Sequence, residues 1–226
     1  WDAVLDGVTS VYISYSPDLA IPGATDSIQQ FVDKAVEHGV SRFVLLSGRG
    51  EEEAQACEKI VQAADVEWTV VRASWFMQNF SEGFMIEGIL DGNLHLPAGD
   101  IAEPFIDIDD IAEIAIASLT EERHSGQLYE VTGPELISFA DIADKFSEHL
   151  NRRVGFESIS MVEFEQRLRK SGVPQGAIEA LTYLFGEVLD GRSESTTDGV
   201  ARALGRPATR FDEYIQRNRQ AFAEVA

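Results

Sequence analysis

Ser47 and Ser74 are the first residues whose positions suggest chemistry, because each follows a short apolar run. Residues 43–46 lead to Ser47, and residues 68–71 lead through Arg72 and Ala73 to Ser74. The segment between them has helical apolar spacing, so the predicted order is strand, helix, strand. Parallel strands joined by one helix end at the same edge of a sheet, where open α/β sheets bind ligands. We therefore expect Ser47 and the loop of residues 72–80 to border a site.

Aromatic side chains dominate that loop. Trp75, Phe76, Asn79 and Phe80 lie in it, and Phe105 lies in a similar short extended segment further on. As the wall of a site they would hold a flat apolar substrate, with Asn79 as the polar group that orients it. The alternative interpretation places them in the core, and we expect some of each.

The residues around Ser47 argue against two common kinds of site. Gly48-Arg49-Gly50 stands where a dinucleotide fingerprint would lie, but Glu53 replaces the third glycine. The acidic run 51–53 suits the first turn of a helix and would repel a pyrophosphate, so we interpret the glycines as a tight turn. The Gly-x-Ser-x-Gly elbow of serine hydrolases is absent because position 45 is Leu. Ser47 then either contacts a ligand or caps a turn or helix, and both interpretations stay open.

Metal ligands are not grouped in this sequence. The four histidines are scattered, with no His or Cys at ligand spacing, which argues against zinc. Asp107, Asp109 and Asp110 form a small acidic group. Mg²⁺ binding is one interpretation of this group, and capping of the following helix is the one we favour. We predict no metal site.

The elements that position these residues alternate between strand and helix. Strands are predicted at residues 8–15, 42–46, 68–71 and 128–132, and helices at 27–38, 51–64, 109–119 and 138–150. This order predicts an α/β protein with a doubly wound parallel sheet. From about residue 151 helices dominate, with one strand at 154–159. We place a sheet domain in residues 1–150 and a small α-rich lobe in 151–226, interleaved with the segment 92–108.

Charge and composition limit the partners. Eighteen Lys and Arg against 39 Asp and Glu give a net charge of −21. Phosphate binding needs a basic surface, so this balance argues against nucleic acids and anionic membranes. The single cysteine, Cys57, cannot form an internal disulfide, and no apolar run is long enough for a membrane span. With no signal-peptide pattern, these features indicate a cytoplasmic protein.

Several segments, taken in order, resemble the NmrA-like family, whose members are atypical short-chain dehydrogenases/reductases. They are SVYISYSPDL, GVSRFVLLS, VEWTVVRASWFMQNFSEG, EPFIDIDDIAEIA and YEVTGPELISFADIA. The closing run ESTTDGVARALGRPATRFDEYIQRN resembles the branch that includes festuclavine and agroclavine dehydrogenases. The resemblance covers essentially the whole chain.

That resemblance implies a Rossmann-like domain, which binds NAD(P)(H) at its strand ends, and a small C-terminal substrate lobe. The cofactor-binding positions it implies are Tyr15, Ser16, Pro17, Ser47, Ala73, Ser74 and Trp75. The substrate-binding positions it implies are Phe76, Asn79, Phe80 and Phe105. It assigns no catalytic residue.

Two departures from the family pattern affect these implications. Family members begin with a strand and a Gly-x-x-Gly-x-x-Gly loop, and the first strands have no counterpart here. Either the polypeptide is truncated, or a homodimer or partner chain covers the open edge of the first strand. We therefore expect weak or absent dinucleotide binding by these 226 residues alone. The Tyr-x-x-x-Lys pair is also absent, since none of the five tyrosines has Lys four residues later.

Two functions follow from the resemblance. One is an NAD(P)H-dependent oxidoreductase that reduces a small aromatic or quinone- or imine-like molecule without a dedicated acid. The other is a non-catalytic sensor of the NAD(P)(H) redox state that regulates a partner protein. The sequence does not separate them.

Overall fold

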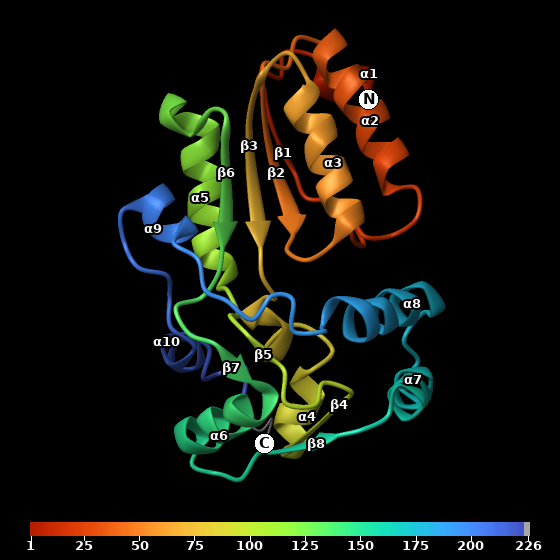
Figure 1. The fold of residues 1–226 in the computed structure, drawn as a ribbon, viewed down its shortest axis with the longest axis vertical. Coiled ribbons are helices and arrows are strands. Elements are labelled where there is room, and N and C mark those ends of the chain that lie inside the picture. Colours follow the sequence, from red (N-terminus) through yellow and green to blue (C-terminus); the bar gives the residue numbers. More distant parts are fainter. Residues whose placement is uncertain (224–226) are drawn as a thin grey trace. The chain divides into compact units, whose positions relative to one another are not determined.

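The computed structural model describes residues 1–223 and divides into two compact units. Unit 1 contains Trp1–Ala73, Asp109–Val131 and Asp198–Pro207, and unit 2 contains Ser74–Ile108, Thr132–Thr197 and the residues from Ala208 on. The chain therefore passes several times from one unit to the other (Figure 1). The division into residues 1–150 and 151–226 concerns function and stays a prediction.

Unit 1 is built on a four-stranded parallel sheet with the order β1-β2-β3-β6. The strands are β1 (Ser10–Ile13), β2 (Arg42–Gly48), β3 (Glu67–Ala73) and β6 (Gln127–Val131). Their register places Ser47 opposite Arg72, and Arg72 opposite Glu130. Because the strands run the same way, their carboxyl ends lie at one edge. The α/β class with a parallel central sheet is confirmed.

Both faces of this sheet are covered. Phe43 and Leu45 on β2 share an apolar core with α2 (Ala24–Glu37) and α3 (Glu52–Ala63). Val44, between them, points to the opposite face and is also fully buried. The other helical elements are α1 (Asp2–Leu5), α5 (Ile108–Thr120, of which Ile108 belongs to unit 2), the 3₁₀ helix η2 (Glu122–His124) and α9 (Gly199–Leu204).

Two elements near the start of the chain differ from their prediction. α2 begins at Ala24, before the expected cap Ser27, and Gly23 precedes it with φ of 88°. Glycine adopts this left-handed conformation without steric cost, so the helix can begin there. The Ser27 hydroxyl instead donates to the Gly23 carbonyl at 3.0 Å. β1 is shorter than residues 8–15 because only Ser10–Ile13 pair with β2.

Unit 2 combines short strands and helices around a phenylalanine-rich core. β4 (Asn93–Leu96) pairs in parallel with β8 (Gly155–Ser158), and β5 (Ala102–Glu103) pairs in antiparallel fashion with β7 (Ile137–Ser138). Its helical elements are the 3₁₀ helix η1 (Met77–Phe80), α4 (Ile86–Asp91), α6 (Phe139–Leu150), α7 (Met161–Lys170), α8 (Gln175–Tyr183), the π-helical turn η3 (Leu184–Val188) and α10 (Phe211–Arg217). β8 confirms the strand predicted at 154–159.

The start of α6 follows directly from its sequence. The Ser138 hydroxyl accepts from the Asp141 amide at 3.1 Å, and the Asp141 carboxylate accepts from the Ser138 amide at 2.8 Å. This is a capping box, which satisfies two amide groups at a helix start.

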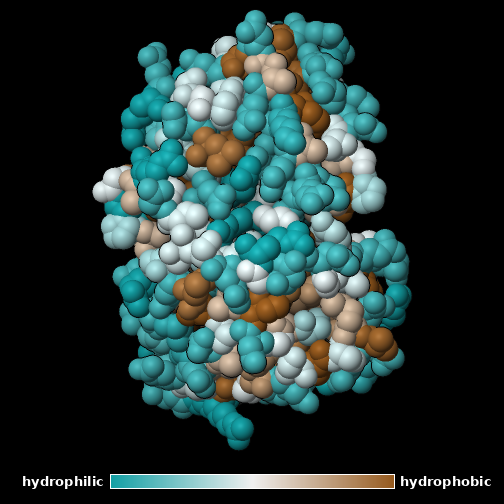
Figure 2. All heavy atoms as spheres, viewed as in Figure 1, coloured by the Kyte–Doolittle hydropathy of each residue, from teal (hydrophilic) through white to brown (hydrophobic). Residues whose placement is uncertain are grey.

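On the face shown in Figure 2 most side chains are hydrophilic, with apolar ones between them. Of the helices that the structure describes, none is both long and apolar enough to cross a membrane.

Candidate functional site

The carboxyl edge of the unit 1 sheet carries three polar side chains in neighbouring positions. They are the penultimate residues of their strands: Ser47 on β2, Arg72 on β3 and Glu130 on β6. The register places them side by side. Paired residues of neighbouring strands point to the same face of a sheet, so these side chains can interact directly.

Arg72 joins two carboxylates from different elements. Its Nη2 lies 2.5 Å from Glu58 Oε2 and its Nε lies 2.9 Å from Glu58 Oε1 on α3. Its Nη1 lies 3.3 Å from Glu130 Oε2. The hydrogen bond to Glu58 is the main cause that raises the pKa of Arg72 above its ordinary value, so the guanidinium stays charged. Glu58 itself is 2 % exposed, and this pairing is what allows a carboxylate to be buried there.

Ser47 is tied to the same carboxylate. Its Oγ donates to Glu58 Oε1 at 2.6 Å, and the residue is buried. A serine hydroxyl has a single hydrogen, which this bond uses. The hydroxyl can still accept hydrogen bonds through its lone pairs. Its contact with a ligand stays a prediction.

Arg49 extends the charged contacts beyond the end of β2. Its Nε lies 2.8 Å from Glu130 Oε1, and its amide donates to the Ala73 carbonyl at 2.9 Å. Gly50 follows with φ of 82°, which supports the interpretation of a tight turn. We call the five residues Ser47, Arg49, Glu58, Arg72 and Glu130 the strand-end network. Its two arginines and two glutamates alternate, so their charges cancel.

Glu51 lies at the start of α3, close to the end of β2, and is 7 % exposed. Burial is the main cause that raises its pKa to about 8, and the charge of Asp18 and a hydrogen bond with Asp18 raise it further. The Glu51 carboxyl group is therefore protonated at neutral pH. Asp18 belongs to the loop after β1, so this contact connects the ends of two neighbouring strands.

Three predicted cofactor residues follow β1. The Tyr15 hydroxyl donates to Ser27 Oγ on α2 at 3.4 Å. Ser16 and Pro17 are exposed and joined by a cis peptide bond. The structure thus places these residues beyond the carboxyl end of β1. Their contact with a cofactor stays a prediction, as does that of Ala73 at the end of β3.

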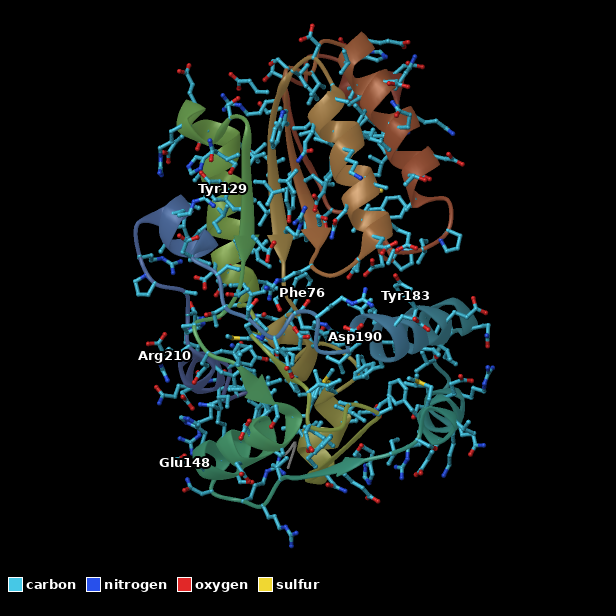
Figure 3. The ribbon with its side chains drawn as sticks, in the orientation of Figure 1. Phe76, Tyr129, Glu148, Tyr183, Asp190 and Arg210 are labelled. Carbon is cyan, nitrogen blue, oxygen red and sulfur yellow. The ribbon has the colours of Figure 1, made fainter. Side chains whose placement is uncertain are left out.

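The other predicted cofactor residues and Phe76 lie in unit 2. Ser74 is buried and donates to Glu103 Oε2 at 3.3 Å. Trp75 packs edge-to-face on Phe185, with ring centroids 5.0 Å apart. Phe76, labelled in Figure 3, forms an isolated β-bridge with the segment that precedes α5. Each of these contacts holds the chain that follows β3 in a defined position.

Phe80 and Phe105 lie in the core of unit 2, as the alternative interpretation of the aromatic residues expected. Phe80 is fully buried and Phe105 is 1 % exposed. Their rings pack edge-to-face at 5.5 Å, and Phe80 makes a similar contact with Phe211 at 5.5 Å. Partial exposure remains at Trp75, Phe76 and Asn79. Their contact with a substrate or cofactor stays a prediction.

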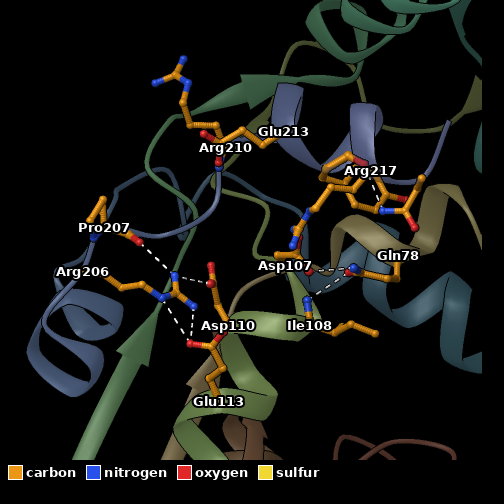
Figure 4. A network of polar contacts seen from close by, with 12 residues as sticks. Gln78, Asp107, Ile108, Asp110, Glu113, Arg206, Pro207, Arg210, Glu213 and Arg217 are labelled. Carbon is orange, nitrogen blue, oxygen red and sulfur yellow. Dashed lines mark hydrogen bonds and ion pairs between the residues drawn. The ribbon is translucent and has the colours of Figure 1, made fainter.

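The acidic group at residues 107–110 is held by neighbouring side chains (Figure 4). In unit 2, fully buried Asp107 accepts from Gln78 Nε2 at 2.8 Å and pairs with Arg217. In unit 1, Asp110 pairs with Arg206 at 2.7 Å. Throughout residues 1–223, no group of three or more His, Cys, Asp or Glu is arranged to hold a metal ion.

Three acidic residues of this region were missed by the sequence-based prediction. Glu58 had a usable signal, because it lies four residues after Ala54 and three before Val61, on the buried stripe of α3. Glu130 lies within a predicted strand at its carboxyl end, which is also a usable signal. Glu51 had none, because its contact is with Asp18 in a distant loop.

The sequence profile of the NmrA-like family matches residues 2–215, nearly the whole chain. The chain belongs to the NmrA-like family. This NmrA-like chain is 30 % identical over 228 residues to festuclavine synthase II of Penicillium roqueforti, an alignment that covers 97 % of this chain and 78 % of the relative. It is 28 % identical over 233 residues to the NAD(P)H azoreductase of Xenophilus azovorans, with 97 % and 79 % covered.

Solved structures show the same fold. The NADPH-dependent quinone oxidoreductase of Escherichia coli, solved with NADPH, superposes with a TM-score of 0.82 at 20 % identity over 95 % of this chain and 78 % of that one. NmrA, a negative transcriptional regulator solved with NADP, gives 0.67 at 20 % identity over 98 % and 76 %. These likenesses confirm the Rossmann-like fold.

Proposed function

We propose that this NmrA-like chain is an NAD(P)H-dependent oxidoreductase that reduces a small aromatic, quinone-like or imine-like molecule. The observation that carries the proposal is the strand-end network, which holds Ser47 among cancelling charges at the carboxyl edge of a parallel sheet. That edge is where this class of fold binds ligands. A relative named as an NAD(P)H azoreductase supports the kind of chemistry.

The donor set at this edge fits one part of a dinucleotide. Tyr15, Ser16 and Ser47 offer hydroxyl groups, while Arg49 and Arg72 pair with carboxylates. Such a polar but neutral surface suits the carboxamide and ribose of a reduced nicotinamide, whereas phosphates favour helix N-termini and cationic side chains. We propose that Tyr15, Ser16, Pro17, Ser47 and Ala73 of unit 1 are cofactor-binding residues. For unit 2 we propose the same role for Ser74 and Trp75.

The chain's own contribution to the reaction is to place the reactants. Bound NAD(P)H would supply a hydride. Phe76 would lie against the flat face of the substrate, and the Asn79 amide would donate to one of its polar atoms. Phe80 and Phe105 would support this surface from the core. We assign no catalytic acid, because the Tyr-x-x-x-Lys pair is absent from the sequence.

The test is NADPH and NADH oxidation by the full-length gene product with quinones, azo dyes and imines as acceptors. We expect acceptor-dependent turnover. Cofactor binding without turnover on any acceptor would contradict the enzyme and favour a non-catalytic NAD(P)(H) sensor that regulates a partner protein. Calorimetric titration of the 226-residue chain tests a separate expectation, weak or absent nucleotide binding. Tight binding would overturn that expectation alone.

The outer edge of β1 suggests how the chain meets other proteins. Among the described residues, β1 pairs with β2 alone, and Tyr12 on it is 38 % exposed. We propose that a second copy or a partner chain covers this edge, because open edges favour pairing. Light scattering that shows a monomer at every concentration would contradict the homodimer.

The net charge of −21 argues against nucleic acids as partners, so we propose that the ligands are small molecules. We also propose that the protein is cytoplasmic.

A further inference from the structure

Ser47, Glu58 and Arg72 form a fixed triangle within the strand-end network. The Ser47 hydroxyl donates to Glu58 Oε1 at 2.6 Å, and Arg72 Nε donates to the same oxygen at 2.9 Å. Arg72 Nη2 occupies the second oxygen at 2.5 Å. A carboxylate bound in this two-pronged way is an acceptor with a set orientation. The hydroxyl hydrogen of Ser47 therefore points inward, toward α3.

The elements that carry these residues hold the triangle rigid. Ser47 and Arg72 are paired in register on β2 and β3. Glu58 stands on the buried stripe of α3, between the fully buried Cys57 and Val61. Close packing around the carboxylate leaves it little freedom to turn away from Ser47.

We propose that Glu58, held by Arg72, is a positioning residue that fixes the Ser47 hydroxyl as a hydrogen-bond acceptor, so that the ligand group meeting Ser47 is an N–H or O–H donor. The inference rests on the proposed function, because it takes the ligand to be a reduced dinucleotide. The carboxamide and the ribose hydroxyls of that molecule are such donors. A quinone oxygen is not, so Ser47 does not polarise a quinone substrate.

The first test needs no ligand and addresses the position of the hydroxyl. Stability is measured for the wild type, Ser47→Ala, the pair Glu58→Met with Arg72→Met, which leaves position 58 without an oxygen acceptor, and the triple variant. Replacing both charges avoids leaving one charge buried alone. We expect the loss in melting temperature from Ser47→Ala to shrink markedly when Glu58 and Arg72 are already replaced. Equal losses in both backgrounds would overturn the role of Glu58.

The second test uses the full-length gene product and its variants. It measures the dissociation constant for NADPH and NADH by nucleotide fluorescence, and KM for a quinone. We expect Ser47→Ala to raise the dissociation constant about five- to tenfold, the worth of one hydrogen bond, and Ser47→Thr to restore much of it. The double variant, in which Glu58 and Arg72 are both replaced, should raise the dissociation constant similarly. Adding Ser47→Ala to it should cause no further increase. KM for the quinone should stay within about twofold, because the quinone offers no donor to Ser47. A rise in quinone KM with unchanged nucleotide affinity would overturn the acceptor role.

Arg42 and Glu67 supply a matched control on the same two strands. They are the first residues of β2 and β3, and their side chains pair at 2.5 Å at the opposite edge of the sheet. Replacing both by Gln should lower the melting temperature and leave nucleotide affinity unchanged. An equal loss of affinity in this control would assign the effect to the fold and overturn the inference. Failure of the full-length gene product to bind either nucleotide would overturn the proposed function and the ligand part of the inference, while the stability test still decides the role of Glu58.

Discussion

The carboxyl group of Glu51 lies directly against the Cα atom of Gly48. A Cβ at position 48 would lie 2.2 to 2.4 Å from the atoms of that group. Gly48 does not have a positive φ, so the requirement for glycine there is one of space. The Glu51 side chain fills the space beside the end of β2, where it also meets Asp18.

We expect Gly48→Ala to displace the Glu51 carboxyl group and to lower the free energy of unfolding by about 1–3 kcal/mol, the usual cost of overpacking. In a Glu51→Ala background the obstacle is gone, so the same change should cost much less. Urea unfolding of the four proteins measures this coupling. Additive losses would contradict the packing argument.

Glu51 should also make stability depend on pH. Its pKa is about 8 in the folded protein, mainly because of burial, against 4.5 as the ordinary value. Between these values the folded protein keeps a proton that the unfolded chain releases. The contribution of Glu51 to stability is therefore fully present below about pH 4.5 and is lost as pH rises toward 8, by at most about 1.4 kcal/mol per pH unit.

The Glu51→Gln variant tests this dependence, because Gln mimics the neutral carboxyl group and cannot ionise. We expect its free energy of unfolding, relative to wild type, to rise steadily from pH 5 to pH 8. Glu52→Gln is the matched control, since it removes an exposed carboxylate from the same helical turn. A parallel pH profile for wild type and Glu51→Gln would show that Glu51 is not protonated in the fold.

The difference between Glu58 and Glu51 shows what the sequence can predict here. The strand–helix alternation of unit 1 and the burial of Glu58 both follow from local periodicity, which depends only on neighbours along the chain. The contact of Glu51 with Asp18, which raises the pKa of Glu51 further, joins residues that are 33 positions apart in the sequence. The start of α2 at Ala24 was missed for a related reason, because Gly23 allows an entry without a side-chain cap. The spacing of apolar residues along the chain does not reveal contacts between residues distant in sequence, and it does not reveal unusual backbone conformations.

The Asp107–Arg217 pair of unit 2 is unevenly buried, and this predicts an order of effects. The Asp107 side chain is fully buried, whereas Arg217 is 48 % exposed. Arg217→Ala leaves a buried carboxylate without its cation and should cost about 3 kcal/mol. Asp107→Asn keeps an acceptor for Gln78 and releases Arg217 to water, so we expect a loss of about 1 kcal/mol.

The double variant, Asp107→Asn with Arg217→Ala, should be more stable than Arg217→Ala alone, because it no longer buries an uncompensated charge. Thermal unfolding of the three variants gives the order. A larger loss of stability in Asp107→Asn than in Arg217→Ala would contradict this order. It would show that losing the partner costs more for the arginine than for the carboxylate.

Phe76 and Phe80 differ in burial, although they are only four residues apart. Phe80 is fully buried among other phenylalanines, so Phe80→Ala should cost about 3–5 kcal/mol of unfolding free energy. Phe76 is half-buried, so Phe76→Ala should cost clearly less unfolding free energy.

If Phe76 contacts an aromatic substrate, its loss should lower kcat/KM about tenfold, since such a contact contributes about 1–1.5 kcal/mol. Phe76→Tyr, which keeps a ring, should retain most activity. Unchanged kcat/KM in a folded Phe76→Ala variant would place the substrate elsewhere, because a half-buried ring that touches the substrate cannot be removed without weakening that contact.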